Sequence, residues 1–121
     1  MYIKGKSVEE KILHLYNYLL ERKYKDVAVY DISNEKQDFD FLFITSCPDE
    51  MTNKKIAKSI VEEFGLKQMP EGYNKGEWII FDLDDIIIHC FTIRAREKYN
   101  LDKLWQSKKV ELAKKKGKNS N

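Results

Sequence analysis

The stretch that most constrains the fold is residues 71–105, because two apolar runs lie close together in it. Trp78–Phe81 and Ile86–Phe91 are rich in β-branched and aromatic residues, and four residues, Asp82–Asp85, separate them. Runs of this composition joined by a short polar turn are typical of a β-hairpin. Aspartate suits such a turn because it tolerates the left-handed backbone conformation. The chain is therefore expected to build a sheet that contains this antiparallel pair.

Two helices and two more strands are predicted before the hairpin. Ser7 and Glu10 fit a capping box, and apolar residues at helical spacing follow them. Pro48 suits the first turn of a second helix, and Gly65 suits its C-terminal stop. The predicted elements are a helix over Val8–Arg22, strands over Val27–Ile32 and Phe39–Thr45, and a helix between Pro48 and Gly65.

The remaining segments predict only short elements. Leu66–Gly72 is interpreted as a crossover with a brief strand, and Arg94–Tyr99 and Leu101–Trp105 as short helical turns. The elements together predict a single α/β (α+β) domain over residues 1–105, with two main helices and a mixed, roughly five-stranded sheet. The apolar pattern fades after Trp105, so residues 106–121 are interpreted as a basic, disordered tail.

The composition is that of a small globular domain without a dominant charge. The formal net charge of the 121 residues is +2, so bulk electrostatics does not indicate a nucleic-acid binder. Cys47 and Cys90 are interpreted as free thiols of a cytoplasmic protein, since a disulfide would require their two runs to be adjacent strands. The N-terminus lacks the apolar stretch of a signal peptide, and no apolar run is long enough to cross a bilayer.

Two aspartates at the start of the second predicted strand raise an enzymatic alternative. Asp38 and Asp40 flank Phe39, and residues two apart in a strand share a face, so both carboxylates could hold a divalent cation. With Asp82 as a third carboxylate, they would suit a metal-dependent nucleotidyltransferase. Such an enzyme also needs a glycine-rich phosphate loop, which Thr45–Cys47 does not supply. Solvated carboxylates are therefore the preferred interpretation.

Histidine and aromatic residues in this region allow structural and binding interpretations. His89 shares a strand face with Ile87 and Phe91 but has no partner at triad or zinc spacing, so a hydrogen-bonded core residue is preferred. Trp78 opens the first strand of the hairpin, where a tryptophan can anchor a protein partner. The basic and aromatic residues after the hairpin would also suit a generic RNA-binding module. These residues are Arg94, Arg96, Lys98 and Tyr99.

Taken in order along the chain, these motifs resemble the ribosomal silencing factor family, which is also called Iojap. The family pattern has an E-G pair, a tryptophan opening a strand, an acidic turn, an apolar run into V-H-V-F, and R-x-x-Y-x-L-x-x-L-W. The matching segments here are Glu71-Gly72, Trp78–Asp85, Ile86–Phe91 and Arg96–Trp105. Asp26–Ile32 and Asp40–Thr45 also resemble the family's first two strands, so the resemblance covers roughly residues 7–105.

The resemblance implies a non-catalytic function, no cofactor or metal, and a fold like that of nucleotidyltransferases. Members of the family bind ribosomal protein uL14 on the large ribosomal subunit and sterically block the small subunit from joining, which represses translation. Free members are often homodimers. The basic tail lies outside the family motif, and the alternatives for it are a secondary contact with ribosomal RNA or no function. Carried over position by position, the partner-binding residues are Trp78, Asp82, Asp85, Arg96 and Tyr99. His89 and Trp105 match the motif and are interpreted as structural.

The chain departs from the family pattern in two places. Asp84 stands where the family has a turn glycine, and aspartate can adopt the positive φ that such a turn requires. The family's T-G-x-S-x-x-H after the second strand reads Thr45–Met51 here, without its glycine, serine and histidine. Any function of that loop in the family is therefore called into question for this chain.

Overall fold

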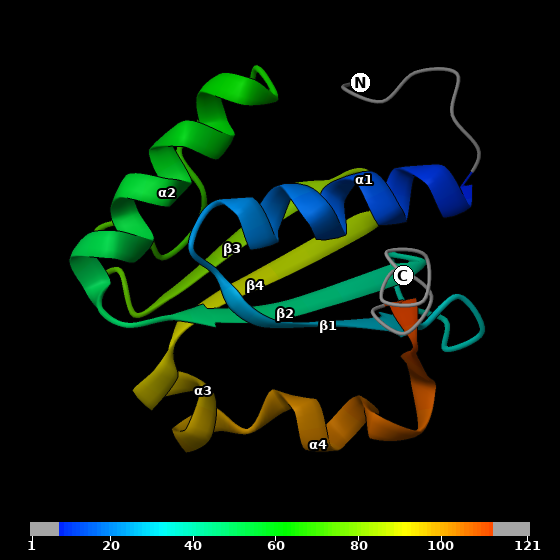
Figure 1. Ribbon diagram of the computed structural model, residues 1–121. Helices are drawn as coiled ribbons and strands as arrows, with labels where there is room; N and C mark the ends of the chain where they lie inside the picture. Colours follow the sequence, from blue (N-terminus) through cyan, green and yellow to red (C-terminus); the bar gives the residue numbers. More distant parts are fainter. Residues whose placement is uncertain (1–7, 113–121) are drawn as a thin grey trace, which may run out of the picture.

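The computed structural model describes residues 8–112 of the chain. Four helices, one 3₁₀ turn and five strands follow one another along these residues (Figure 1). In chain order they are α1 (Val8–Glu21), β1 (Lys25–Asp31), β2 (Phe41–Cys47), α2 (Glu50–Glu63), β3 (Trp78–Leu83), β4 (Ile86–Thr92), α3 (Ile93–Tyr99), α4 (Leu101–Trp105), the 3₁₀ turn Gln106–Lys108 and β5 (Lys109–Val110). None of the helices in this part of the chain is long and apolar enough to cross a membrane.

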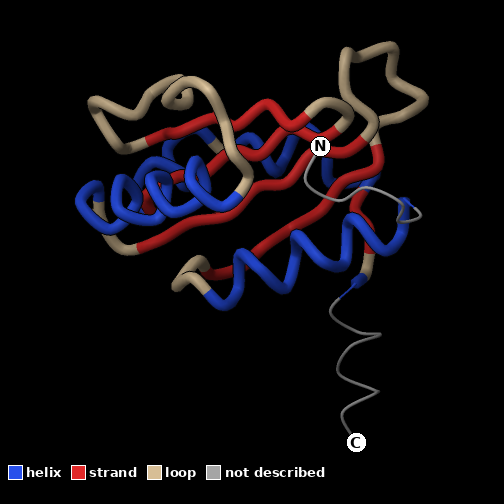
Figure 2. Tube along the Cα trace, turned by 90° about the horizontal axis from the view of Figure 1, so that it is seen from above, coloured by secondary structure: helices blue, strands red, loops and turns tan. Residues whose placement is uncertain are grey.

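The strands form one mixed sheet in the order β3-β4-β2-β1-β5 (Figure 2). β2 and β4 run parallel, whereas the other neighbouring strands are antiparallel. Parallel neighbours need a long crossover connection, and α2 lies within the segment that joins β2 to the β3–β4 hairpin. The predicted α+β domain with a mixed five-stranded sheet and two main helices is confirmed.

The prediction of a brief strand within Leu66–Gly72 is wrong, and the fifth strand lies elsewhere. The crossover over Leu66–Gly72 contributes only a single bridge, between Glu71 and Ile80 at the outer edge of β3. The fifth strand is β5 at the opposite edge, where it pairs with Val29 and Tyr30 of β1. The chain therefore continues in the fold beyond the expected boundary at Trp105, whereas residues 113–121 of the expected tail lie outside the described residues.

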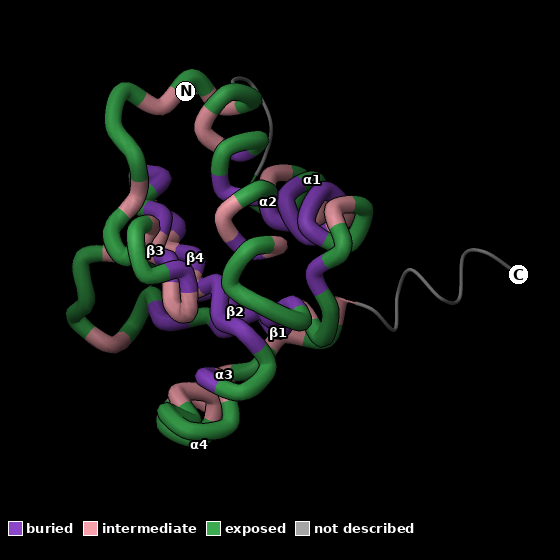
Figure 3. Tube along the Cα trace, turned by 90° about the vertical axis from the view of Figure 1, so that its left-hand side faces the viewer, coloured by how far each residue is buried: buried purple, intermediate pink, exposed green. Residues whose placement is uncertain are grey.

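Helices cover the two faces of the sheet unequally. α1 and α2 lie over one face, and α3 and α4 lie under the other (Figure 1). The larger core is formed where α1 and α2 meet the sheet, and it includes Leu15, Phe43 and Ile60. The smaller core lies between the sheet and α3 and α4. It includes Leu42 and Ile44, and its strand residues come mainly from β1 and β2. Buried segments accordingly concentrate between the layers (Figure 3).

The boundaries of α2 follow from local chemistry. Asp49 is its N-cap, with a side-chain oxygen that accepts a hydrogen bond from the Thr52 amide at 2.8 Å. Pro48 therefore precedes the helix and is not in its first turn. Gly65 follows the last helical turn with φ +61°, which confirms it as the expected C-terminal stop. Asp49 belongs to the segment that departs from the family pattern, so that segment has a structural role here.

A buried asparagine connects α2 to the rest of the fold. Asn53 is fully buried, and its amide nitrogen donates to the carbonyl oxygens of Gly76 and Cys90 at 2.8 and 2.9 Å. Its carbonyl oxygen accepts a hydrogen bond from the Tyr24 hydroxyl at 2.7 Å. These bonds satisfy a polar side chain that would otherwise be costly to bury. Cys90 and Cys47 lie nearby as buried free thiols, as the sequence predicted.

Candidate functional site

The β3–β4 hairpin is longer and its turn is tighter than expected. Asp82 and Leu83 belong to β3, pairing with Ile87 and Ile86, so only Asp84 and Asp85 form the turn. Asp84 has φ +67°, the conformation that the absent glycine would adopt most easily. The aspartate thus keeps the two-residue turn, at some cost in backbone strain, and adds a carboxylate to its tip.

One face of the hairpin remains partly open. Along β3 and β4 the side chains alternate, and one set is buried against α1 and α2. The other set faces the side of α3 and α4, but these short helices lie mainly over β1 and β2. We call the uncovered residues the open face: half-buried Trp78, Ile80, Ile87 and His89, and exposed Asp82. It combines apolar side chains with one carboxylate, a composition suited to binding a protein.

Aromatic rings continue the open face onto α3. The Tyr99 ring, 42% exposed, lies with its centroid 4.7 Å from that of Trp78. Trp78 also packs on Phe91 at 4.9 Å, and its indole nitrogen donates a hydrogen bond to Nδ1 of His89 at 2.9 Å. The structure therefore brings Trp78, Asp82 and Tyr99 to one surface and gives His89 the structural contact that was preferred for it.

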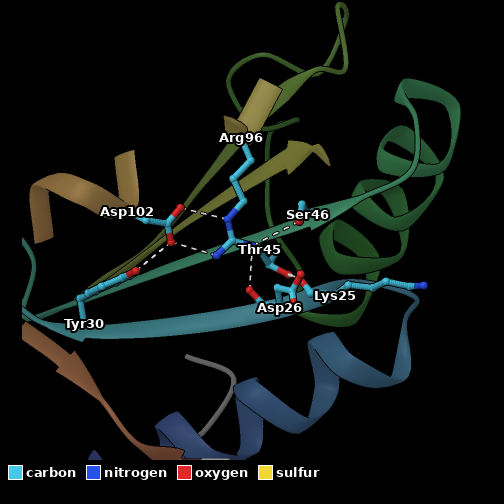
Figure 4. Close-up of polar contacts among 7 residues, drawn as sticks. All are labelled: Lys25, Asp26, Tyr30, Thr45, Ser46, Arg96 and Asp102. Carbon is cyan, nitrogen blue, oxygen red and sulfur yellow. Dashed lines mark hydrogen bonds and ion pairs between the residues drawn. The ribbon is translucent and has the colours of Figure 1, made fainter. Parts of the chain in front are cut away.

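Arg96 differs from the expectation that it is exposed with these residues. Its guanidinium lies over β1 and β2, where Nε and Nη2 donate to Asp102 at 3.0 and 2.9 Å (Figure 4). Nη1 donates to the Asp26 carbonyl oxygen at 2.7 Å and to Ser46 Oγ at 3.2 Å. With its side chain only 16% exposed, Arg96 fastens α3 to the sheet.

The carboxylate of Asp102 is the other half of this network. It accepts a hydrogen bond from the Tyr30 hydroxyl at 2.7 Å in addition to those from Arg96. Burial of Asp102 raises its pKa, but the hydrogen bonds from Arg96 and Tyr30 outweigh burial and hold the pKa below its ordinary value. Asp102 is therefore ionised, and it links α4 to both α3 and β1.

The carboxylates of the enzymatic alternative do not assemble into a metal site. Asp38, Asp40 and Asp82 are exposed, and residues 8–112 contain no group of three His, Cys, Asp or Glu side chains that could hold a metal ion. Asp85 is half-buried, and its main-chain oxygen accepts hydrogen bonds from the amides of Asp40 and Phe41 at 2.8 and 3.1 Å. Asp85 thus ties the hairpin turn to the preceding loop.

His89 makes the stability of the hairpin sensitive to pH. Burial lowers its pKa from 6.5 to about 4, so the folded protein keeps the ring neutral. The unfolded chain binds a proton as the pH falls below 6.5 and the folded protein does not, so stability decreases between these two values. We expect the free energy of unfolding to be about 2 kcal/mol lower at about pH 5 than at about pH 7. Urea unfolding at the two pH values checks this.

The control for this pH dependence is His89→Asn, because the Oδ1 of asparagine takes the place of Nδ1 as the acceptor of the hydrogen bond from Trp78. The other titrating groups are unchanged in that variant, so subtracting its pH dependence isolates the part due to His89. Equal pH dependence in the two proteins would contradict the prediction.

Ile80 and Ile87 are the members of the open face that the sequence reasoning missed. The available signal was strand alternation, because Ile80 lies two residues from both Trp78 and Asp82. Ile87 lies two residues from His89 on the same strand face, so alternation indicated it as well, whereas its pairing with Asp82 required the two-residue turn.

Comparisons with known proteins agree on one family. A family model described as "Ribosomal silencing factor during starvation" matches residues 5–121. The ribosomal silencing factor of Halalkalibacterium halodurans is 29% identical over 103 residues, covering 82% of this chain and 88% of that protein. The corresponding factor of Bacillus subtilis is 27% identical over 89 residues, covering 70% of this chain and 75% of that protein.

Two solved structures share the fold. A crystal structure of a Chromobacterium violaceum protein has a TM-score of 0.72 at 24% identity, covering 84% of this chain and 88% of that chain. A crystal structure of a Bacillus halodurans protein has a TM-score of 0.67 at 30% identity, covering 85% of this chain and 99% of that chain.

Proposed function

The chain belongs to the ribosomal silencing factor family, and we propose that it binds ribosomal protein uL14 on the large ribosomal subunit and blocks the small subunit from joining. The block is steric, requires no catalysis or cofactor, and represses translation in the cytoplasm. The observation that carries the proposal is the open face, a largely apolar surface beside an acidic turn that the protein's own helices leave partly uncovered.

The composition of the open face indicates what its partner must present. Trp78 and Tyr99 supply large aromatic contact areas, which are frequent anchors in protein interfaces. Ile80 and Ile87 form an apolar floor between these rings and the turn. Asp82 adds an exposed negative charge, which attracts a lysine or arginine of the partner. A matching partner surface carries an apolar side chain flanked by basic groups.

Arg96 and Asp85 position the elements that carry this surface. Arg96 holds α3 on the sheet through Asp26 and Ser46, and α3 carries Tyr99. Asp85 holds the turn that follows Asp82, through the main-chain bonds to Asp40 and Phe41. We therefore assign contact with uL14 to Trp78, Asp82 and Tyr99, with Ile80 and Ile87 added, and a positioning role to Arg96 and Asp85.

Charge reversal on the open face tests the docking site. The double variant Asp82→Lys/Tyr99→Ala is expected to weaken binding to large subunits by about thirtyfold or more, because an anchor is lost and a repulsive charge is introduced. Both residues are exposed, so the fold tolerates the changes. Co-sedimentation with purified large subunits, at several protein concentrations, measures the change.

The matched control is Glu9→Lys, an equal charge reversal at an exposed position in the first turn of α1, on the other face of the sheet. It is expected to bind as the unchanged protein does. A subunit-joining assay tests the consequence, since the double variant should no longer prevent the small subunit from joining. Normal binding by the double variant, or equal losses in both variants, would contradict the assignment of the open face.

We also propose that the free protein is a homodimer, as the family resemblance implies. Sedimentation velocity across a range of concentrations measures this directly. A single monomeric species at micromolar concentrations would contradict it.

A further inference from the structure

A second charged surface lies on the opposite face of the sheet, between the end of α1 and the first half of α2. It is a hollow of about 360 Å³. Arg22, Lys23 and Lys55 supply three positive charges to its lining, Thr52 and Ser59 supply hydroxyl groups, and Glu21 is the single carboxylate. We call these three cations and two hydroxyls the basic hollow.

The cations of the basic hollow have carboxylates near them: Asp49 attracts Lys55, and Glu62 and Glu63 line a neighbouring hollow together with Arg22. In the described part of the chain, none of the three forms an ion pair with a carboxylate. The guanidinium carbon of Arg22 lies 3.9 Å from the centroid of the Tyr18 ring, so the planar group is held by a cation–π contact. A guanidinium fixed in this way loses little entropy on binding, and its geometry matches the paired oxygens of a phosphate.

Two acidic segments of the chain gather at one end of the sheet. Residues 31–40 and 82–85 contain seven carboxylates and one lysine, and they flank the end of the sheet where β2 begins and the hairpin turns. The basic hollow lies at the other end, where β2 leads into α2 (Figure 1). It also lies on the face covered by α1 and α2, away from the open face. One partner surface therefore cannot satisfy both sites.

We propose that the basic hollow binds phosphate groups of an RNA backbone, which makes it a second contact of this protein with the ribosome. Three cations and two hydroxyl donors in one lining suit a chain of phosphates, because phosphate oxygens accept hydrogen bonds from cations and from hydroxyl groups. The ribosomal setting rests on the proposed function, whereas the affinity for RNA phosphates does not. The two can therefore fail separately.

Fluorescence anisotropy with a labelled single-stranded polyuridine oligonucleotide of about 20 nucleotides, long enough to span one protein site, tests the proposal. The double variant Lys23→Glu/Lys55→Glu is expected to bind about tenfold or more weakly at low salt. The slope of log Kd against log salt concentration should also be smaller in the variant, by about 1.4 if two phosphate contacts are lost. Urea unfolding of the variant establishes that it is folded.

The matched control is Lys103→Glu with Lys98→Glu, the same charge change at exposed positions on the face of α3 and α4. It is expected to retain most of the affinity. Equal losses in the two double variants would mean that RNA responds only to net charge, and would overturn the proposal. Equal displacement of the oligonucleotide by a polyglutamate of the same length would also overturn it, since the hollow would then accept any polyanion.

The open-face variant Asp82→Lys/Tyr99→Ala separates this proposal from the proposed function. It should lose large-subunit docking and keep its affinity for the oligonucleotide. Binding of large subunits by the unchanged protein, with no detectable affinity for the oligonucleotide at low salt, would overturn the RNA proposal and leave the docking proposal standing.

Discussion

The Asp102→Ala variant is expected to lose about 3 kcal/mol of its free energy of unfolding, because removing one partner of a largely buried ion pair leaves the other uncompensated. The Asp102 carboxylate accepts two hydrogen bonds from Arg96 and one from Tyr30. Alanine would leave a guanidinium that is largely buried and a buried phenol without that acceptor. The total stability of such a domain is about 5–15 kcal/mol, so the loss would be large.

Urea unfolding followed by circular dichroism measures this effect. Glu97→Ala is the control, because it also removes one carboxylate, but from an exposed position of α3 next to Arg96. It is expected to change stability by no more than about 0.5 kcal/mol. A loss for Asp102→Ala no larger than that of Glu97→Ala would contradict the role assigned to the network.

The Gly72→Ala variant is expected to lose about 3 kcal/mol as well, from backbone strain and overpacking together. Gly72 has φ +82°, and a Cβ added there would lie 2.0 Å from the carbonyl oxygen of Trp78. The segment cannot easily move away, since the Ile80 amide donates a hydrogen bond to the neighbouring Glu71 carbonyl oxygen at 3.0 Å. The glycine of the E-G motif is thus required by the close approach of two backbones.

Gly65→Ala separates the two contributions. Gly65 also has a positive φ, +61°, but nothing lies within 4 Å of an added Cβ. It should therefore lose only the strain of about 1–2 kcal/mol. Urea unfolding of both variants gives the difference, which measures the clash with Trp78. Equal losses would show that the clash is relieved without cost.

Gly72→Ala also bears on docking, because the carbonyl group that it would displace belongs to Trp78. Under conditions where the variant is still folded, its affinity for large subunits should decrease. Gly65→Ala should bind normally, since its loop does not touch the open face. The pair of variants therefore tests whether the position of Trp78 matters for docking, without any change to the docking residues themselves.

The elements that the sequence predicted well depend on neighbouring residues. The hairpin, the stop at Gly65 and both main helices follow from periodicity and turn chemistry within a few residues. Asp84 was expected to adopt a positive φ in the turn, and it does. These features are local because the backbone conformation of a turn or a helix end is decided by the residues that form it.

The elements that the sequence missed depend on contacts between distant residues. β5 has only two residues and no strand signal of its own, and it exists because Val29 and Tyr30 offer an edge to pair with. Arg96 looked like a surface cation in sequence. Its acceptors are Asp26 and Ser46, 70 and 50 residues away, and Asp102, which lies beyond the end of α3.

The sequence by itself determined that residues 71–105 contain a hairpin with an acidic turn, and its family resemblance identified Trp78, Asp82, Asp85, Arg96 and Tyr99 as the residues to examine. The tertiary structure decided that one face of that hairpin stays partly open, because the short helices α3 and α4 lie mainly over β1 and β2 and reach the hairpin only near Phe91, Trp78 and Ile87. It also decided that Arg96 points away from this face. Such outcomes follow from how distant segments pack, and local sequence patterns carry no information about that packing.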